Sequence, residues 1–377
     1  MIRRLNSNAG RIPSLDGIRA IAIASVLVCH FCGDLYGTNP LNLGELGVRI
    51  FFVLSGYLIT TLLLKELERT GNINLRHFYF RRTMRIFPPF YFYLGVMLAF
   101  SIFHLSSLTV SAAWPALTYT SNLFRKLGPS SYAITHTWSL SIEEQFYLVW
   151  PLLLVLAGKR RAPWLLVSVL VLGPLVRGYI HLCCGVSIGG WDLSRVGLPD
   201  HIATGCLLAF FRVTLQANAA YIRLQRSRAF IVVPVLVVLA NSENSHLGII
   251  AGALRLALNV LIALCIDWAI TNHTGMLGRA LNSRIPSSIG VLSYSLYLWQ
   301  QPFTHLHLAQ PAIYLHGRWQ IIATPVISLI SIFACACFSY FAVERPSLRF
   351  RERLEAGTIR SDRENASVPV TASALVS

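Results

Sequence analysis

Residues 17–31, GIRAIAIASVLVCHF, form an apolar run that carries Arg19 near its start and His30 near its end. Extended to residue 36, the run is long enough for a membrane-spanning helix. Eleven residues at 100° each bring Arg19 and His30 within about 20° of the same face, roughly 16 Å apart along the axis. Both side chains cost free energy inside a bilayer, so their presence indicates a function.

Arg19 and His30 differ in how well a structural role explains them. Arg19, at the edge of the span, is also typical of an interfacial anchor whose charged end reaches the headgroups. His30 lies past the middle of the span, where a neutral imidazole can accept a proton from a hydroxyl group as a general base. We therefore interpret His30 as a candidate catalytic residue.

The composition of the 377-residue chain is that of an integral membrane protein. Apolar residues make up 54%, charged residues 13%, and the mean hydropathy is +0.57, whereas a soluble domain is about one-quarter charged. The net charge of +16 is attributed to membrane orientation and anionic headgroups, because no basic stripe with interleaved aromatics indicates a nucleic-acid groove. The opening residues, MIRRLNSNAGRIPSLDG, lack a signal-peptide core, so we expect the first apolar run to remain as an anchor.

Apolar runs of about membrane-spanning length predict an all-α, polytopic fold with about ten transmembrane helices. The sixth and seventh runs are the shortest. The predicted spans are 20–36, 48–64, 88–105, 142–158, 163–181, 198–211, 229–240, 247–270, 287–308 and 319–342.

The distribution of lysine and arginine predicts that both termini are cytoplasmic. In this orientation the cytoplasmic segments hold 25 of the 32 Lys and Arg residues and the outer segments hold six, as the positive-inside rule requires. We expect one membrane domain over residues 1–350 and a cytoplasmic, disordered tail over residues 351–377, whose end is rich in Ser, Ala and Val.

The eight cysteines form no recognisable framework. Cys29 and Cys32 have the C-x-x-C spacing of redox and metal sites. However, no second ligand pair at zinc spacing occurs, and cysteine in a lipid-buried helix behaves as a small apolar residue. We therefore predict no metal site.

Four arginines, Arg76, Arg81, Arg82 and Arg85, crowd the inner end of the third span in RHFYFRRTMRIFPPFY. Such a cluster is typical of any positive-inside loop. Guanidinium groups also bind phosphate through paired hydrogen bonds, so the cluster is equally a candidate receptor for a polyphosphate.

Two adjacent carboxylates follow in THTWSLSIEEQFYLVWP. Ser141 and Glu144 fit a capping box at the start of the fourth span, which gives Glu144 a structural alternative. Glu143 has none. It lies on the outer side, toward which His30 also lies, and a carboxylate there can orient an imidazole or bind a sugar hydroxyl.

Polar residues recur in other spans. Residues 55–57, Ser-Gly-Tyr, interrupt the second span, residues 200–201, Asp-His, open the sixth, and residues 293–302, SYSLYLWQQP, line the ninth. Each group alone is also explained as interhelical hydrogen bonding. Together they predict a polar passage through the protein.

Seven stretches resemble, in order, the motifs of the acyltransferase-3 family of bacterial membrane acyltransferases. They cover about residues 13–347, and seven in order are specific although each alone is weak. The stretches are LDGIRAIAIASVLVCHF, GVRIFFVLSGYLIT, FYFRRTMRIFPPFY, WSLSIEEQFYLVWP, LPDHIATGCLLAF, SYSLYLWQQP and VERP.

The resemblance implies a multi-pass O-acyltransferase of the bacterial inner membrane that holds no permanent cofactor. It would move an acyl group, usually acetyl, from cytoplasmic acyl-CoA (acetyl-CoA) to a hydroxyl of a carbohydrate or lipid-linked glycan. Acceptors in the family include lipopolysaccharide, exopolysaccharide, Nod factors and peptidoglycan. The family's essential Arg-x10-His pair falls on Arg19 and His30, and its functional Glu falls on Glu143 or Glu144.

The resemblance also associates the arginine cluster with acyl-CoA. We expect the donor to be bound by Arg81, Arg82, Arg85, Ser55, Tyr57 and Tyr294, and the acceptor by Trp138, Asp200 and Gln300.

The chain departs from the family pattern in the ninth span. Many members have a His after Tyr-Leu-Trp, where this chain has Gln300 and Gln301, so we expect His30 to be the principal base, oriented by Glu143. An acyl-His30 intermediate stays open beside direct transfer. We expect no appended SGNH-type esterase domain, so that a second transfer step would need a separate partner.

Two other classes of protein fit part of the pattern. A multi-pass transporter or flippase for a polar solute also has polar groups inside its spans, although no inverted repeat favours it. A non-catalytic scaffold does not explain the ordered intramembrane ionisable groups. The sequence identifies neither the acceptor nor the oligomeric state.

Overall fold

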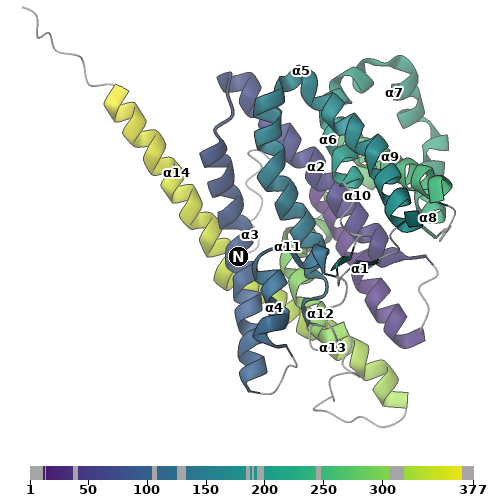
Figure 1. Cartoon of the computed structure of the whole chain (residues 1–377), viewed down its shortest axis with the longest axis vertical. Coiled ribbons are helices and arrows are strands. Elements are labelled where there is room, and N and C mark those ends of the chain that lie inside the picture. The colour runs from purple at the N-terminus through teal and green to yellow at the C-terminus, as the bar shows by residue number, and fades with distance from the viewer. Residues whose placement is uncertain are drawn as a thin grey trace, which may run out of the picture.

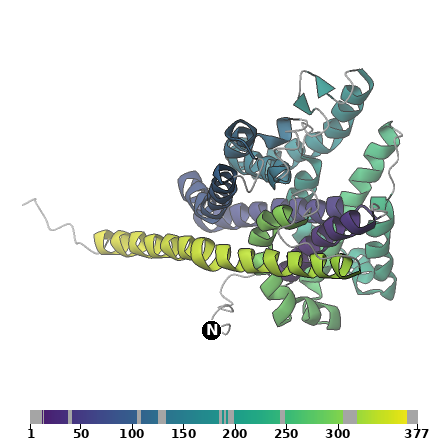
Figure 2. The same cartoon turned by 90° about the horizontal axis from the view of Figure 1, so that it is seen from below.

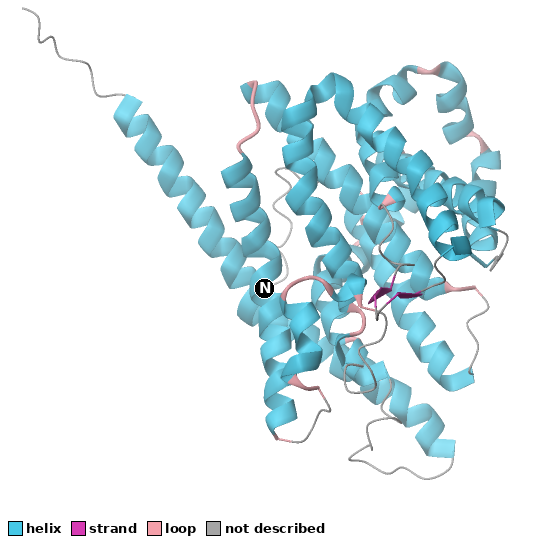
Figure 3. Ribbon diagram, viewed as in Figure 1, coloured by secondary structure: helices cyan, strands magenta, loops and turns pink. Residues whose placement is uncertain are grey.

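The protein is a bundle of helices (Figure 1; Figure 3). The computed structural model describes residues 12, 14–36, 41–103, 108–124, 133–183, 187–188, 191–192, 199–242, 248–304 and 318–366. Within these ranges the sheet structure is one antiparallel pair of two-residue strands, β1 (Ser187–Ile188) and β2 (Trp191–Asp192). The predicted helical class is confirmed.

The helices follow one another through the whole described chain. The first half contains α1 (Leu15–Tyr36), α2 (Leu43–Thr70), α3 (Leu75–Ile102), α4 (Val110–Leu117), the 3-10 turn η2 (Ser121–Leu123) and α5 (Thr137–Cys183). The second half contains α6 (Asp200–Ala217), α7 (Ala219–Arg226), the 3-10 turn η4 (Arg228–Ile231), α8 (Val232–Ser242), α9 (Gly248–Thr271), α10 (Met276–Leu281), α11 (Arg284–Trp299), α12 (Gln301–Thr304), α13 (Arg318–Ser339), the π-helical turn η5 (Tyr340–Glu344) and α14 (Arg345–Ala366).

All ten predicted apolar runs overlap helices of the structure. The fourth and fifth runs form one element, α5, which breaks at Gly158 (φ 72°, ψ 164°), a backbone conformation that favours glycine. Five described helical stretches are long and apolar enough to cross a membrane, or six if α6 and α7, bent by 96°, form one span. The chain is thus a multi-pass membrane protein, while the count of ten spans and the cytoplasmic termini stay predictions.

Helix α2 packs against α1, α5, α6 and α9. A Cβ on Gly56 would lie 2.1 Å from the carbonyl oxygen of Ile202, and one on Gly205 would lie 1.9 Å from that of Val53. Glycine at both positions therefore lets α2 and α6 approach backbone to backbone. Helix α2 is continuous through residues 55–57, so the polar residues there do not break it.

The bend between α6 and α7 is fixed by a buried carboxylate, Asp267 of α9. It accepts hydrogen bonds from Arg212 Nε (2.5 Å), Gln216 Nε2 (2.6 Å), the Tyr221 hydroxyl (2.8 Å) and Gln225 Nε2 (2.8 Å). A buried charge requires such compensation, so this network ties α6 and α7 to α9.

Ion pairs join α2 to α3 and to α5 at one end of the bundle, where Arg81 pairs with Glu66 at 3.3 Å. Lys159 pairs with Glu68 at 2.6 Å, which places the Gly158 break beside the C-terminal end of α2. The N-terminal half of α3 starts at this end (Figure 1). We call it the arginine-rich end; the opposite end holds α4, η2 and the start of α5.

Helix α14 continues α13 and η5 and extends well beyond the bundle (yellow in Figure 2). It packs on α3, where Glu355 lies 3.3 Å from His77, and Ser347 donates to the carbonyl of Met84 at 2.6 Å. Pro88 lacks the amide that would otherwise bond this carbonyl. Residues 351–366 of the expected disordered tail are therefore helical, and residues 367–377 lie outside the described residues.

Candidate active site

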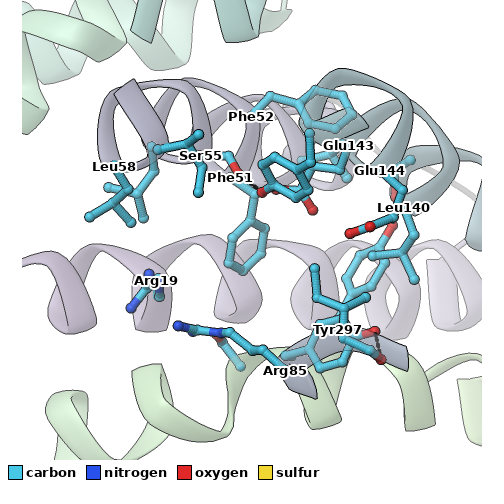
Figure 4. Close-up of a pocket in the computed structure, with 18 of the residues that line it drawn as sticks. Arg19, Phe51, Phe52, Ser55, Leu58, Arg85, Leu140, Glu143, Glu144 and Tyr297 are labelled. Carbon is cyan, nitrogen blue, oxygen red and sulfur yellow. Dashed lines mark hydrogen bonds between the residues drawn. The ribbon is translucent and has the colours of Figure 1, made fainter. Parts of the chain in front are cut away.

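A cavity of about 110 Å³ lies between α1, α2, α3, α5 and α11 (Figure 4). Apolar side chains of α2 form much of one wall. The polar and charged lining residues are Arg19, Ser55, Arg82, Arg85, Ser139, Glu143, Glu144, Tyr147, Ser293, Tyr294 and Tyr297. The structure thus brings together, in one cavity, charged residues that lie more than 100 positions apart in the sequence.

Positive charge is concentrated at one end of the cavity. Arg19 and Arg85 lie together there (Figure 4), and Arg19 also pairs with Asp16 at 2.8 Å. The Arg85 side chain is solvent-accessible. The Arg82 guanidinium stacks on the Tyr147 ring, with its Cζ 3.6 Å from the ring centroid. This end is suited to an anionic ligand such as a phosphate.

Arg81 does not join this group in the structure. It pairs with Glu66 of α2 at 3.3 Å and is absent from the lining of the cavity. On a helix, Arg81 and Arg82 point about 100° apart, so only one of the two neighbours faces the cavity.

The carboxylates of Glu143 and Glu144, on α5, lie across the cavity from Arg19 and Arg85 (Figure 4). Arg82, stacked on Tyr147, lies nearer to these carboxylates and interacts electrostatically with Glu144. The Tyr147 hydroxyl donates to Glu143 Oε1 at 2.7 Å and is also hydrogen-bonded to Ser55. Tyr147 therefore links α2 to α5 and fixes one face of the Glu143 carboxylate.

Glu144 also lines the cavity, and the capping-box interpretation of Glu144 is wrong. Helix α5 begins at Thr137, so Ser141 lies inside the helix. Its hydroxyl donates to the Thr137 carbonyl (3.0 Å) and accepts from the Ser121 amide (3.2 Å). Glu144 is thus positioned by the helix and not by an N-cap.

His30 lies outside the lining of the cavity and interacts electrostatically with His136, just before α5. The His136 ring packs edge-on against Tyr93 and Tyr297, with centroids 5.7 and 5.4 Å away. The Tyr297 hydroxyl, which lines the cavity, donates to the His136 carbonyl at 3.2 Å. The two histidines therefore lie beyond the Tyr297 wall, away from the arginines.

Sequence reasoning missed His136. The residue stands in the quoted stretch THTWSLS, at the polar edge of a predicted span, and an ionisable residue at such a position is a signal of function. What the sequence does not reveal is its electrostatic interaction with His30, which depends on the tertiary packing of the helices.

Only some of the residues predicted to bind the donor line the cavity. Ser55 and Tyr294 line the cavity, and the Tyr294 hydroxyl donates to the Ile86 carbonyl at 3.0 Å. Tyr57 instead packs in the apolar cluster that α2 forms with α6 and α9, among Leu54, Leu208 and Ile262.

The predicted acceptor residues lie outside the cavity lining. Trp138 contacts the lining residue Phe52 edge-on, with centroids 6.3 Å apart. Asp200 is buried and accepts from Asn259 Nδ2 at 3.2 Å. Gln300 is fully buried, and the next residue, Gln301, donates to the Thr135 side chain at 3.2 Å.

No group of three or more His, Cys, Asp or Glu residues arranged to hold a metal ion occurs among the described residues. The polar side chains that line the described part of the cavity are arginines, carboxylates and hydroxyls, and the histidines lie nearby.

These features define a multi-pass membrane protein with a charged internal cavity. A family model described as an acyltransferase domain matches residues 12–343. The chain therefore belongs to the acyltransferase-3 family, as the seven motifs predicted.

Curated relatives agree with this assignment. OatA of Listeria monocytogenes (serovar 1/2a, strain EGD-e), a peptidoglycan O-acetyltransferase, is 29% identical over 351 residues, 85% of this chain and 54% of the relative. The O-acetyltransferase OatA of Staphylococcus aureus (strain NCTC 8325) is 29% identical over 364 residues, 89% of this chain and 57% of the relative. YrhL of Bacillus subtilis (strain 168) is by its name a candidate peptidoglycan O-acetyltransferase. It is 30% identical over 365 residues, which are 89% of this chain and 54% of the relative.

The chain thus spans about half the length of the curated relatives it matches. No solved structure matches it significantly.

Proposed function

We propose that this chain transfers an acetyl group from acetyl-CoA to a hydroxyl of a carbohydrate or lipid-linked glycan. The observation that carries the proposal is the polarity of the site: Arg19 and Arg85 lie together at one end of the cavity, and His30 and His136 lie beyond the other, past Tyr297. A donor with phosphates and an acceptor with a hydroxyl are complementary to these two ends.

The donor binds at the end of the cavity that holds Arg19 and Arg85. Arg82 and Arg85, with Arg19, offer guanidinium groups to the phosphates of CoA. Because Arg19 and His30 are roughly 16 Å apart along α1, the extended pantetheine arm is of the right order of length to carry the thioester toward His30. Ser55 and Tyr294 line this route.

The acceptor reaches His30 from the opposite end. His30 removes the hydroxyl proton as the acceptor oxygen attacks the thioester carbonyl carbon. The carbon–sulfur bond breaks, CoA leaves as the thiolate, and the thiolate takes up a proton. Glu143, which accepts a hydrogen bond from Tyr147, stabilises from the cavity side the positive charge that His30 acquires with the proton.

The orientation follows from the charges. With 25 of the 32 Lys and Arg residues in the segments assigned to the cytoplasm, the arginine-rich end faces the cytoplasm, where acetyl-CoA is found, and the membrane is the bacterial inner membrane. Peptidoglycan is the first acceptor to test, because OatA of Listeria monocytogenes is named a peptidoglycan O-acetyltransferase.

The test is transfer of label from [¹⁴C]acetyl-CoA to glycans in membranes that contain wild type or His30→Ala at matched expression. His77→Ala is the matched control, because His77 lies on the outside of α3 against Glu355. We expect label with wild type and with His77→Ala, and none above background with His30→Ala. Equal labelling by all three proteins would remove His30 as the base.

A further inference from the structure

Four buried polar atoms in one region lack hydrogen-bond partners in the described part of the chain. They are both ring nitrogens of His136, the indole nitrogen of Trp299 and Oε1 of Gln300. The three side chains are 5%, 5% and 0% exposed. Buried polar groups in proteins are nearly always hydrogen-bonded, and leaving them unpaired is costly. A ligand bound in this region would supply the missing hydrogen-bond partners.

The three residues belong to one cluster although they come from two distant parts of the chain, the turn before α5 and the end of α11. The Tyr93 ring of α3 contacts both His136 and Trp299 edge-on, with centroids 5.7 and 5.2 Å away. Gln301 donates to the Thr135 side chain at 3.2 Å, which ties the start of α12, directly after Gln300, to the residues just before α5. The unpaired atoms are thus held by fixed aromatic and polar contacts.

The cluster adjoins the reacting end of the site. His136 interacts electrostatically with His30. Its carbonyl accepts from the hydroxyl of Tyr297, which lines the cavity and is also hydrogen-bonded to Ser139 at 2.6 Å. A ligand bound to His136 therefore lies within electrostatic range of His30 and on the Tyr297 side of the cavity.

We propose that His136, Trp299 and Gln300 form the subsite that binds the carbohydrate acceptor and presents its hydroxyl to His30. The inference rests on the proposed function and names the residues that hold the acceptor.

The chemistry of the unpaired atoms selects this class of ligand. A neutral His136 donates from one nitrogen and accepts at the other, Trp299 only donates and Gln300 Oε1 only accepts. A sugar with neighbouring hydroxyls both donates and accepts. The acetyl thioester has only an acceptor oxygen, and CoA phosphates are acceptors that the arginines serve. The amides and hydroxyl of the pantetheine arm also donate and accept, so the measurements with acetyl-CoA distinguish this arm from the sugar as the ligand.

The test compares His136→Phe and His136→Gln with wild type in nanodiscs, using soluble peptidoglycan fragments as the acceptor. Phenylalanine keeps an aromatic ring against Tyr93 and Tyr297 but removes both nitrogens, whereas glutamine keeps one donor and one acceptor. Two readouts are taken from each protein: the KM for fragments and for acetyl-CoA, and the rise in Tm that each ligand produces.

We expect His136→Phe to raise the KM for fragments about 10- to 100-fold and to lose the fragment-induced rise in Tm. Its KM for acetyl-CoA and the rise in Tm with acetyl-CoA should stay at wild-type values, and His136→Gln should recover part of the fragment binding. His77→Phe is the control and should match wild type.

If His136→Phe keeps the wild-type KM for fragments and the fragment-induced rise in Tm, the proposal is overturned. That result would indicate that only buried water fills the site. A wild-type protein that the fragments do not stabilise would overturn it for this class of acceptor. Fragments that stabilise wild type but not His136→Phe support the subsite even if no acetyl transfer is detected, a result that would count against the proposed function alone.

Discussion

Replacing Tyr147 by phenylalanine tests whether the Glu143 carboxylate must be held in place. The hydroxyl of Tyr147 donates to Glu143 at 2.7 Å and is hydrogen-bonded to Ser55. Phenylalanine removes both bonds and keeps the ring on which Arg82 stacks at 3.6 Å. The change therefore isolates the hydroxyl from the packing and from the cation–π contact.

The expected loss can be worked from these contacts. A hydrogen bond to a charged group contributes about 1.5–3 kcal/mol. If the bond to Glu143 is needed in the transition state, kcat/KM falls about 10- to 150-fold. The assay is transfer of label from [¹⁴C]acetyl-CoA to soluble glycan by purified protein, at several concentrations of each substrate.

Tyr79→Phe is the matched control. The Tyr79 hydroxyl donates to the Leu148 carbonyl at 2.7 Å outside the cavity lining, so this variant loses one comparable bond and should change kcat/KM less than about twofold. A Tyr147→Phe enzyme that is as active as Tyr79→Phe would refute the reasoning that Glu143 is positioned by this hydroxyl.

Three further outcomes follow from the structure. Arg85→Ala should raise the KM for acetyl-CoA at least about tenfold, because the substitution removes a guanidinium from the cavity. Arg81→Ala breaks only the pair with Glu66 and should change this KM less than about threefold. Equal effects of the two substitutions would contradict the assignment of Arg85 to the donor site. Gly205→Val should destabilise the protein by about 1–3 kcal/mol, because its Cβ falls 1.9 Å from a backbone oxygen of α2, and an unchanged Tm would contradict the packing. Asp267→Ala should cost about 3 kcal/mol and lower Tm without changing the KM for either substrate; a selective rise in one KM would instead indicate a role in binding.

The apolar runs predicted the positions of the helices because lipid exposure requires long, uninterrupted hydrophobic segments. The apolar runs did not predict the structure of the polar segments between and after them. The Gly158 break depends on one residue's backbone conformation. The extension of α14 depends on tertiary contacts with α3, such as that between Glu355 and His77, which local composition does not encode.

Part of the site was also predictable. Arg19, Arg82, Arg85 and Glu143 stood out as charges next to apolar runs, and all four line the cavity. Tyr57 was grouped with Ser55 because they are neighbours in sequence, yet on a helix they point about 200° apart, and Tyr57 packs in the apolar cluster.

His136 shows the limit most clearly. Its sequence context is a short polar segment that a single sequence cannot distinguish from a loop. Its interest comes from burial, from two unpaired nitrogens and from the approach of His30. All three properties arise only when α1, α3, α5 and α11 are packed together.

The most direct test of transfer through the cavity uses sealed vesicles of opposite orientation and [¹⁴C]acetyl-CoA, which does not cross membranes, added outside. In inside-out vesicles the arginine-rich end faces the label, and we expect wild type, but not His30→Ala, to acetylate glycan enclosed in the lumen. Right-side-out vesicles should give no labelled glycan. Labelling that is equal in both orientations, or that survives in His30→Ala, would contradict acetyl transfer from the arginines to His30.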